Sequence, residues 1–253
     1  MDRISRQRRP ARATGVRARL RRPVLGTLLR LIDNRERIDR SRTPVDGRPT
    51  AASGRGPYFL ADPPTRRDVR EDRDGIPLTL RIHAVEATTG QPLDGAGVEI
   101  WHCDASGAYS AYQAYDPEKF PNLVAMTLRR NRPTEPGTFL RGRQTADRDG
   151  RVEFRSIVPG WYTPRTLHVH CRVVDHATTP GVELLTTELY FPEEVAADAF
   201  ATQPYARRGP SPFTNVNDIE IAMAKGAPGS WLTVSRVGSG YVAEVTVRTP
   251  PRP

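Results

Sequence analysis

The chain contains few of the residues that stabilise very small or membrane-spanning proteins. Its 253 residues include two cysteines, Cys103 and Cys171, too few for a disulfide-rich scaffold or a four-cysteine zinc site. The sequence leaves open whether these two cysteines pair with each other. No segment approaches 18 consecutive apolar residues, which excludes a transmembrane helix. A chain of this length can bury a full hydrophobic core in one large domain without disulfides or a structural metal.

Lysine is also scarce, with two residues, so the net charge of +9 comes almost entirely from arginine. Residues 1–43 contain 14 arginines and four acidic residues, whereas the remaining chain contains 24 basic and 25 acidic residues. The nearly neutral remainder and the lack of a groove-reading motif argue against nucleic-acid binding. We expect a disordered, Arg/Pro-rich flexible tail over residues 1–55 and a single domain over residues 56–249.

An export signal is the alternative interpretation of this tail. Arg21 and Arg22 precede the apolar run 23–32, an arrangement that resembles a twin-arginine signal. The run is short, Arg30 interrupts it, and no A-x-A-like cleavage site follows. We therefore expect a cytoplasmic protein, and keep export by a degenerate twin-arginine-like N-terminus as the alternative.

From residue 56 onward, short segments alternate apolar and polar residues as β-strands do. Residues 76–87 place Leu78, Leu80 and Ile82 on one face and polar residues on the other. Six further segments have the same pattern: 95–103, 151–158, 166–174, 184–191, 231–237 and 241–247. Residues 192–201 are the best candidate for a short helix. This pattern predicts an all-β fold, an antiparallel β-sandwich with long loops.

The H-x-H pair of His168 and His170 is the first candidate for chemistry. On a strand the two imidazoles point the same way, roughly 7 Å apart, and can converge on a metal ion. H-x-H alone equally fits ordinary histidines on a polar face. Two tyrosines lie nearby: Tyr162 in the Pro/Gly turn before this strand, and Tyr109 after the strand at 98–103. One tyrosine at a strand end usually serves packing, but these segments together point to a shared site.

Together, these segments resemble the intradiol ring-cleavage dioxygenases, the family of catechol, hydroxyquinol and protocatechuate dioxygenases. The family block G-x-P-x-x-G-A-x-V-x-I-W followed by a tyrosine stands at residues 90–101 with Tyr109. The block P-G-x-Y followed by R-x-x-H-x-H stands at residues 159–170. The resemblance extends from Gly56 to about Val247 and is strongest to the short, single-domain bacterial branch.

The resemblance implies a mononuclear, non-haem Fe(III) bound by Tyr109, Tyr162, His168 and His170. Phenolate is a hard anionic donor that suits a trivalent ion. The resemblance also implies O₂-dependent cleavage of a catechol between its two hydroxylated carbons, which yields a muconic acid in aromatic-compound catabolism. Tyr162 would serve as a base for a substrate proton, and Arg165 would stabilise negative charge on the ring. The partners implied are the catechol and O₂, and a homodimer is left open.

One position departs from the family pattern. Glu188 stands where the family usually has glutamine, and we expect it to pair with Arg165 at the substrate pocket as a further catalytic residue. His102, near the first block, is expected to pack or to hydrogen-bond rather than to bind metal. The alternative function is a non-catalytic, transthyretin-like β-sandwich binding module. Such modules share the G-x-P-L-x-G-A-x-V segment but do not require the tyrosine and histidine block.

Overall fold

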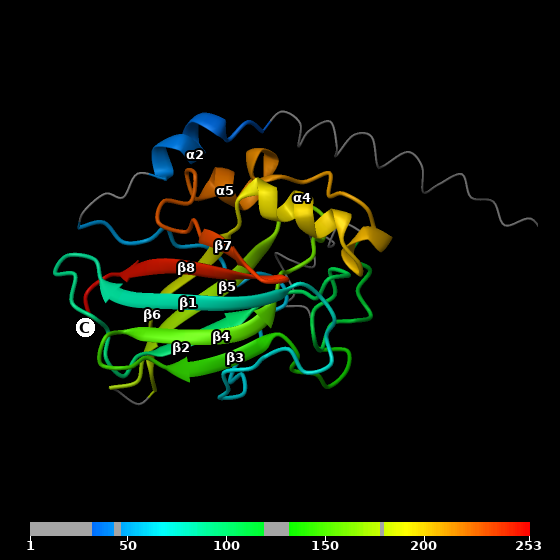
Figure 1. Ribbon diagram of the computed structural model, residues 1–253. Helices are drawn as coiled ribbons and strands as arrows, with labels where there is room; N and C mark the ends of the chain where they lie inside the picture. Colours follow the sequence, from blue (N-terminus) through cyan, green and yellow to red (C-terminus); the bar gives the residue numbers. More distant parts are fainter. Residues whose placement is uncertain (1–31, 43–46, 119–131, 178–179) are drawn as a thin grey trace, which may run out of the picture.

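Two four-stranded sheets form most of the fold in this computed structural model, which describes residues 32–42, 47–118, 132–177 and 180–253 (Figure 1). One sheet has the order β4 (Arg151–Ile157), β1 (Pro77–Glu86), β8 (Gly240–Thr249), β7 (Thr233–Val237). The other has the order β3 (Arg141–Thr145), β2 (Gly97–Trp101), β5 (His168–Asp175), β6 (Val182–Tyr190). The helices are α2 (Arg35–Ser41), α4 (Glu193–Ala201), α5 (Ile219–Met223), η1 (Tyr205–Arg207) and η2 (Asn215–Asn217).

The prediction of a strand-rich fold is confirmed, but the expectation of purely antiparallel sheets is wrong. Strands β1 and β8 pair in parallel, with a register that runs from Leu78 opposite Tyr241 to Glu86 opposite Thr249. The other pairings between named strands are antiparallel. A parallel pair needs a long connection, and almost the whole domain lies between β1 and β8 in sequence. The sheet that contains them is therefore mixed.

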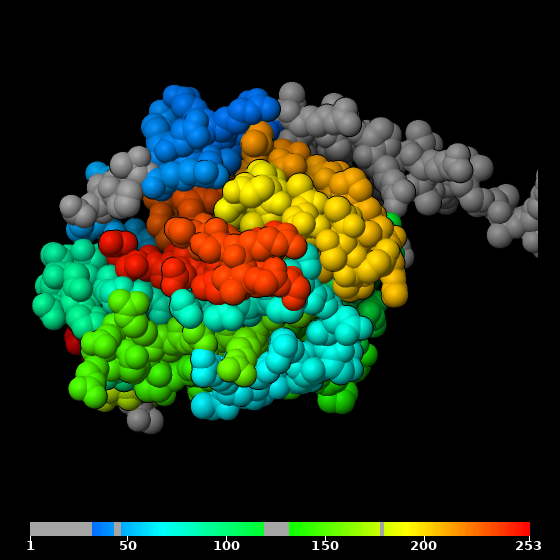
Figure 2. Space-filling view, in the orientation of Figure 1, coloured from blue at the N-terminus to red at the C-terminus, as the bar shows by residue number. Residues whose placement is uncertain are grey.

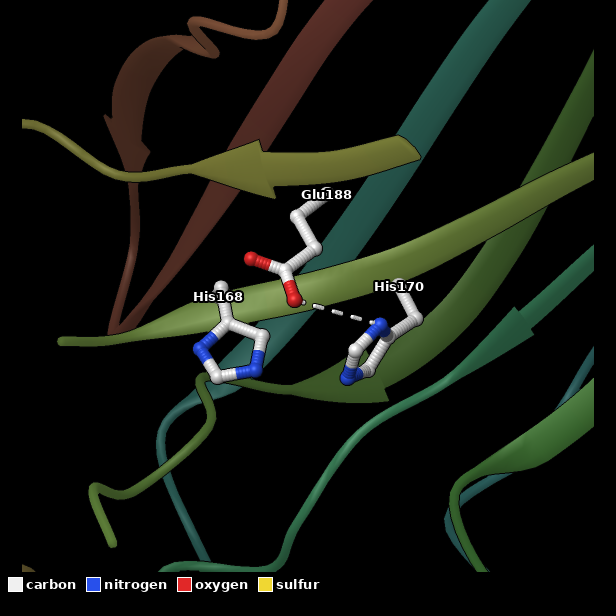
Figure 3. Close-up of side chains that lie close together, drawn as sticks. All are labelled: His168, His170 and Glu188. Carbon is white, nitrogen blue, oxygen red and sulfur yellow. Dashed lines mark ion pairs between the residues drawn. The ribbon is translucent and has the colours of Figure 1, made fainter. Parts of the chain in front are cut away.

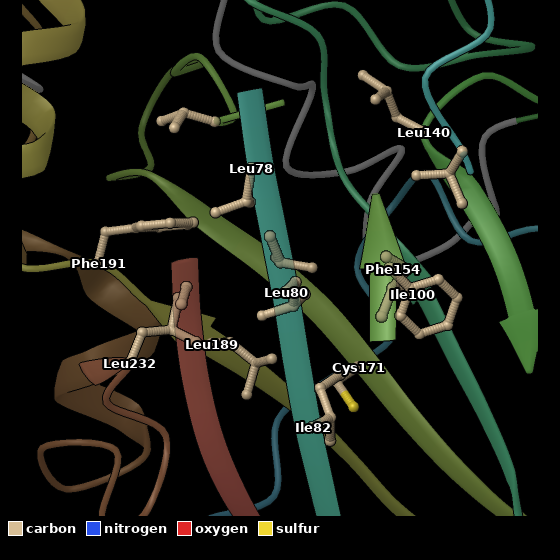
Figure 4. Packing of buried hydrophobic residues seen from close by; sticks show 14 of the residues in the cluster. Leu78, Leu80, Ile82, Ile100, Leu140, Phe154, Cys171, Leu189, Phe191 and Leu232 are labelled. Atoms are coloured by element: carbon tan, nitrogen blue, oxygen red, sulfur yellow. The ribbon is translucent and has the colours of Figure 1, made fainter. Parts of the chain in front are cut away.

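The hydrophobic core lies between the two sheets (Figure 4). Leu80 of β1 and Phe154 of β4 belong to the same buried cluster as Ile100 of β2 and Cys171 of β5. Cys171 is a free, buried thiol, and so is Cys103, so these cysteines do not form a disulfide. Burial of these apolar side chains supplies the main driving force that holds the sheets together.

The sequence pattern predicted helix α4 but not strand β3. The helix expected at 192–201 is confirmed as α4. Strand β3 was not anticipated, because its sequence RGRQT has no apolar alternation. Arg141 in β3 is nevertheless buried, and its guanidinium donates to Ser110 Oγ (2.6 Å) and to the Ser110 carbonyl (3.0 Å).

The expectation of a flexible tail up to residue 55 is wrong for its described part. Residues 35–41 form helix α2, whose Ile38 packs in one buried cluster with Tyr190 and Ile221. In the space-filling view, the blue segment that contains α2 lies against the orange segment that contains α5 (Figure 2). Tertiary packing of one apolar face forms this helix despite its seven-residue length.

Residues 47–55 are also bound to the domain. The Thr50 amide donates to the Arg248 carbonyl (2.8 Å), and the Ser53 amide donates to the Thr186 carbonyl (2.9 Å). Residues 1–31, with most of the apolar run considered as an export signal, lie outside the described residues. Within the described ranges, no helix has the length and apolar character needed to cross a membrane.

Candidate active site

The two histidines of the H-x-H pair lie side by side on β5. Their ring centroids are 4.9 Å apart, and both extend toward Glu188 (Figure 3). Val169 and Cys171, which alternate with them on β5, belong to the hydrophobic core on the opposite face. His168 is 2% exposed and His170 is 1% exposed. Burial lowers the pKa of both imidazoles, which keeps them neutral. Neutral imidazole is the form that binds metal ions.

A backbone carbonyl sets the orientation of His168. The Nδ1 atom lies 2.7 Å from the Thr166 oxygen, and because a carbonyl only accepts, Nδ1 carries the proton. The other ring nitrogen, Nε2, is therefore unprotonated and faces Tyr162, whose Oη is 3.5 Å away. Metal-binding histidines characteristically donate their second ring nitrogen to a carbonyl or carboxylate in this way.

Packing against both Trp101 and the backbone of Gly56 fixes the position of the His170 ring. It stacks on Trp101 with centroids 4.8 Å apart and ring planes 2° from parallel. A Cβ atom at Gly56 would lie 2.9 Å from His170 Cε1, so the backbone there packs closely against the imidazole. The Nδ1 atom is 3.5 Å from Glu188 Oε1 and has no hydrogen-bond partner among the described residues.

Two adjoining turns bring the tyrosines together. Tyr109 follows β2 and Tyr162 precedes β5, and their ring centroids are 5.5 Å apart at 81°. A Cβ atom at Gly160 would lie 2.6 Å from the Ala105 carbonyl oxygen, so the turn that carries Tyr162 packs directly on the turn before Tyr109. The glycine of the P-G-x-Y block is needed for this close approach.

The four side chains fit a ferric ion. Tyr109 Oη is buried and has no hydrogen-bond partner in the described part of the chain, an arrangement that is costly unless another group satisfies it. Burial raises the pKa of Tyr109 and of Tyr162 well above that of a free tyrosine. A bound trivalent cation would reverse this by favouring the phenolates. Two hard oxygen donors and two imidazoles suit iron better than the soft metals that thiolates select.

Glu188 offers a second set of donors beside the tyrosines. One ligand atom each from His168, His170 and Glu188 lie within 4.8 Å of one another (Figure 3). However, the carboxylate already accepts hydrogen bonds from Arg165 Nη1 (2.9 Å) and Tyr190 Oη (2.5 Å). The set that includes the two tyrosines is therefore more available to a metal than the set that includes Glu188.

Arg165 lies between two carboxylates. The predicted pair with Glu188 is confirmed, since both guanidinium Nη atoms donate to its carboxylate. Burial disfavours the ionised form of Glu188, but Arg165 holds the pKa of this carboxyl well below its usual range. On its other side, Arg165 Nε donates to Asp218 Oδ2 at 3.0 Å. The positive charge of the guanidinium is thus balanced by two carboxylates, those of Glu188 and Asp218.

Comparison with known proteins identifies the family. The family model described as Dioxygenase matches residues 55–209, more than half of the chain. The chain belongs to the intradiol ring-cleavage dioxygenase family. The family resemblance inferred from the two sequence blocks is therefore confirmed.

Curated relatives and solved structures agree with this membership. The chain is 26% identical over 167 residues to the chlorocatechol 1,2-dioxygenase of Rhodococcus opacus, covering 56% of each protein. It is 27% identical over 175 residues to the catechol 1,2-dioxygenase of Pseudomonas sp. (strain EST1001), covering 60% of this chain and 48% of that relative. The chain thus spans about half the length of these curated relatives.

Two solved structures match more of the chain. An intradiol ring-cleavage dioxygenase from Tetranychus urticae has a TM-score of 0.70 and 27% identity, over 81% of this chain and 95% of that one. The dioxygenase domain of a carbohydrate-binding fusion protein from Streptomyces sp. SirexAA-E has a TM-score of 0.54 and 27% identity, over 80% and 99%. The similarity therefore includes most of the two-sheet fold.

Several residues around the candidate site were not anticipated as site residues. Trp101 and Tyr58 lie within the segments that resemble the family, but no role was predicted for them. Trp101 stacks on His170, and Tyr58 stacks on Tyr109 with ring centroids 4.6 Å apart. Asp218 follows a loop without a recognisable motif, so only the fold reveals it. The expectation for His102 is confirmed, because its Nδ1 bonds to the Cys103 oxygen (2.8 Å) and its Nε2 bonds to Ser156 Oγ (2.7 Å).

Proposed function

We propose that this protein is an Fe(III)-dependent intradiol dioxygenase that opens a catechol-type ring between its two hydroxylated carbons and yields a muconic acid. The convergence of four buried donors, from Tyr109, Tyr162, His168 and His170, is the observation that carries this function. Family membership supports the reaction class. The names of the relatives, catechol and chlorocatechol 1,2-dioxygenases, support catechols as the substrate class, with O₂ as co-substrate.

Ferric iron bound by these four residues would draw electron density from a bound catecholate and make the ring reactive toward O₂. The remaining chemistry belongs to the protein. Tyr162, whose Oη lies 3.5 Å from His168 Nε2, would accept the proton of a substrate hydroxyl as a general base. The guanidinium of Arg165 would stabilise negative charge that develops on the ring.

The surroundings of the site favour an aromatic substrate. Tyr58, Trp101 and Tyr112 form one buried cluster with the two tyrosine ligands. Aromatic walls of this kind pack against a planar ring and exclude water. A water-poor site also strengthens the interaction between Arg165 and a developing negative charge.

The charges around Arg165 favour neutral catechols over carboxylated ones. Glu188 and Asp218 both form ion pairs with the single guanidinium of Arg165, which leaves less of its charge to attract a substrate carboxylate. A hydroxyl or amino substituent could instead donate to one of these carboxylates. Catechol, chlorocatechol and hydroxy- or amino-substituted catechols are therefore the proposed substrates, ahead of protocatechuate.

The test is turnover by iron-loaded protein with catechol and ¹⁸O₂. The expected result is a muconic acid that contains both labelled oxygen atoms, with one O₂ consumed per catechol. Tyr109→Phe should abolish this turnover, whereas Tyr112→Phe should retain it, because Tyr112 Oη donates to the Phe59 carbonyl (3.1 Å) outside the donor set. A protein that binds catechol without consuming O₂ would instead be a binding module.

A further inference from the structure

We infer that Asp218 is a positioning residue for Arg165, and that helix α2 supports Asp218 through Asn34. The consequence for catalysis rests on the proposed function, whereas the contacts themselves do not. Asp218 and Asn34 both lie outside residues 55–209, the segment that the family model matches. Segments beyond the family match would thus complete the active site of this chain.

Asp218 connects the arginine to the strand that carries the histidines. Its Oδ2 accepts hydrogen bonds from Arg165 Nε (3.0 Å) and from the Thr166 amide (2.9 Å), and its Oδ1 accepts from Arg165 Nη2 (3.3 Å). The Thr166 carbonyl in turn orients His168. The side chain of Asp218 is fully buried, so these charge-assisted hydrogen bonds are protected from water.

Asp218 is itself held from two directions. Its Oδ1 caps α5 by accepting hydrogen bonds from the amides of Glu220 and Ile221. Its backbone carbonyl accepts a hydrogen bond from Asn34 Nδ2 at 2.9 Å, and the same Asn34 nitrogen donates to the Asn215 carbonyl at 3.2 Å. Asn34 is fully buried, so it bridges the start of α2 to the loop that carries Asp218.

Two contacts fasten the other end of α2 to the same region. Ser41 Oγ donates to the Gly226 carbonyl (2.6 Å) and accepts a hydrogen bond from Trp231 Nε1 (2.8 Å). Ile38, between Asn34 and Ser41, packs against Tyr190. Tyr190 donates to Glu188. The α2 segment therefore contacts Asp218 directly through Asn34 and reaches Glu188 through Tyr190.

Replacing the carboxylate by an amide separates a positioning role from a purely structural one. In Asp218→Asn the amide oxygen could still cap α5, but the NH₂ group would face the Arg165 and Thr166 donors. Arg165 would then keep only Glu188 as an anionic partner and would lose its fixed orientation. A shift of the Arg165 guanidinium away from the substrate should lower the reaction rate, whereas the metal-binding side chains would be unchanged.

The experiment compares Asp218→Asn with wild type as kcat per bound iron for catechol. The expected result is a decrease of roughly 10- to 100-fold in kcat, with a much smaller change in KM. Iron content and the visible tyrosinate absorption should stay as in wild type. Asp198→Asn, the same change in a surface pair with Arg236, is the control and should leave kcat unchanged. An unchanged kcat per iron in Asp218→Asn would overturn the inference.

Asn34→Ala tests the contribution of α2. It should lower kcat per iron in the same direction, by several-fold, and should add little to the loss in the Asp218→Asn background. Such non-additivity is expected when two residues act through one set of contacts. Fully multiplicative losses would show that Asn34 acts elsewhere, and would overturn the role of α2.

A crystal structure of Asp218→Asn separates this inference from the proposed function. The guanidinium of Arg165 should leave its position between the two acidic side chains, whether or not the protein binds iron. If wild type bound no iron and opened no catechol, the proposed function would fail, and a displaced Arg165 would still support the positioning role. An Arg165 that had not moved would refute it. Should Asp218→Asn not fold, the structure of Asn34→Ala decides in the same way.

Discussion

Glu188 contacts Arg165 and lies beside the two histidines that we propose bind the metal. Its carboxylate binds both Nη atoms of Arg165, and its Oε1 lies 3.5 Å from His170 Nδ1. A negative charge here reduces the attraction between Arg165 and a catecholate ring. The same charge favours the tautomer of His170 that carries its proton on Nδ1 and leaves Nε2 for the metal.

Glu188→Gln should raise kcat/KM for unsubstituted catechol by about tenfold, equivalent to ~1.4 kcal/mol at the transition state. Glutamine keeps the size and one acceptor but removes the charge that offsets Arg165. The measurement compares wild type and variant on catechol, hydroxyquinol, protocatechuate and an amino-substituted catechol. Glu183→Gln at the start of the same strand, which changes a half-buried pair with Arg172, is the control and should show no gain.

A loss of turnover on the hydroxy- or amino-substituted catechol would show that Glu188 recognises that substituent. Equal rates for wild type and Glu188→Gln on all four substrates would contradict both roles for this carboxylate.

Local sequence could predict only part of the site at the level of residues. The histidine pair and the two tyrosines stand in short, ordered blocks, and the fold brings all four side chains together. The pairing of Glu188 with Arg165 was predicted from their positions in the family pattern and their opposite charges, and it is confirmed. Asp218 could not be predicted, because it reaches Arg165 from 53 residues away through a loop whose path depends on the whole fold. The metal-binding role of the four ligands stays a prediction.

At the scale of elements, two glycine-containing turns determine how the tyrosines meet. Gly160→Ala should destabilise the fold by about 1–3 kcal/mol and weaken iron binding, because its Cβ would lie 2.6 Å from the Ala105 oxygen. The turns that carry Tyr109 and Tyr162 would then be pushed apart. Urea unfolding and iron retention during dialysis measure the two effects. Gly54→Ala, where the nearest atom lies 3.8 Å away, is the control, and equal behaviour of both variants would refute this role.

His102 links the two sheets and should make stability depend on pH. It follows β2, and its Nε2 bonds to Ser156 of β4 in the other sheet. Burial lowers its pKa to about 4, whereas an unfolded histidine has a pKa of about 6.5. The unfolded chain therefore binds a proton first as the pH falls. This contribution to stability is complete above pH ~6.5 and is lost toward pH ~4, by about 3 kcal/mol.

Urea unfolding of metal-free protein between pH 7 and pH 4.5 tests this dependence. The free energy of unfolding should fall more steeply with acidification in wild type than in His102→Gln, which has no group titrating at this position. Parallel slopes for the two proteins would contradict the assignment, whatever their absolute stabilities.

Strand alternation predicted most strands but not their partners. A period of two shows which face of a strand is buried, and the segments assigned to β1, β2 and β4 to β8 have that pattern. It contains no information on which strands pair, so the parallel contact of β1 with β8 was missed. Helix α2 was missed for a related reason, since its stability comes from Ile38 and Asn34 packing against residues near position 220.

At the scale of the whole molecule, the proposed site depends on segments from most of the chain. Asn34 lies near the N-terminus, the tyrosines and histidines lie in the middle, and Asp218 lies close to the C-terminal strands. The sequence showed correctly that the basic charge is concentrated at the N-terminus. Composition alone did not reveal that residues 32–42 pack against the domain, because a helix with one apolar contact residue resembles a solvated segment.

The most direct test of the central claim is the iron content and visible absorption of the purified protein and of one matched pair of variants. We expect about one iron per chain and a tyrosinate-to-iron absorption band that gives the wild type a wine-red colour. Tyr112→Phe should keep both, whereas Tyr109→Phe should lose the iron or change the band, because it removes a ligand oxygen. Wild-type protein that stays colourless after reconstitution with iron, or Tyr109→Phe protein with the full band, would contradict the claim.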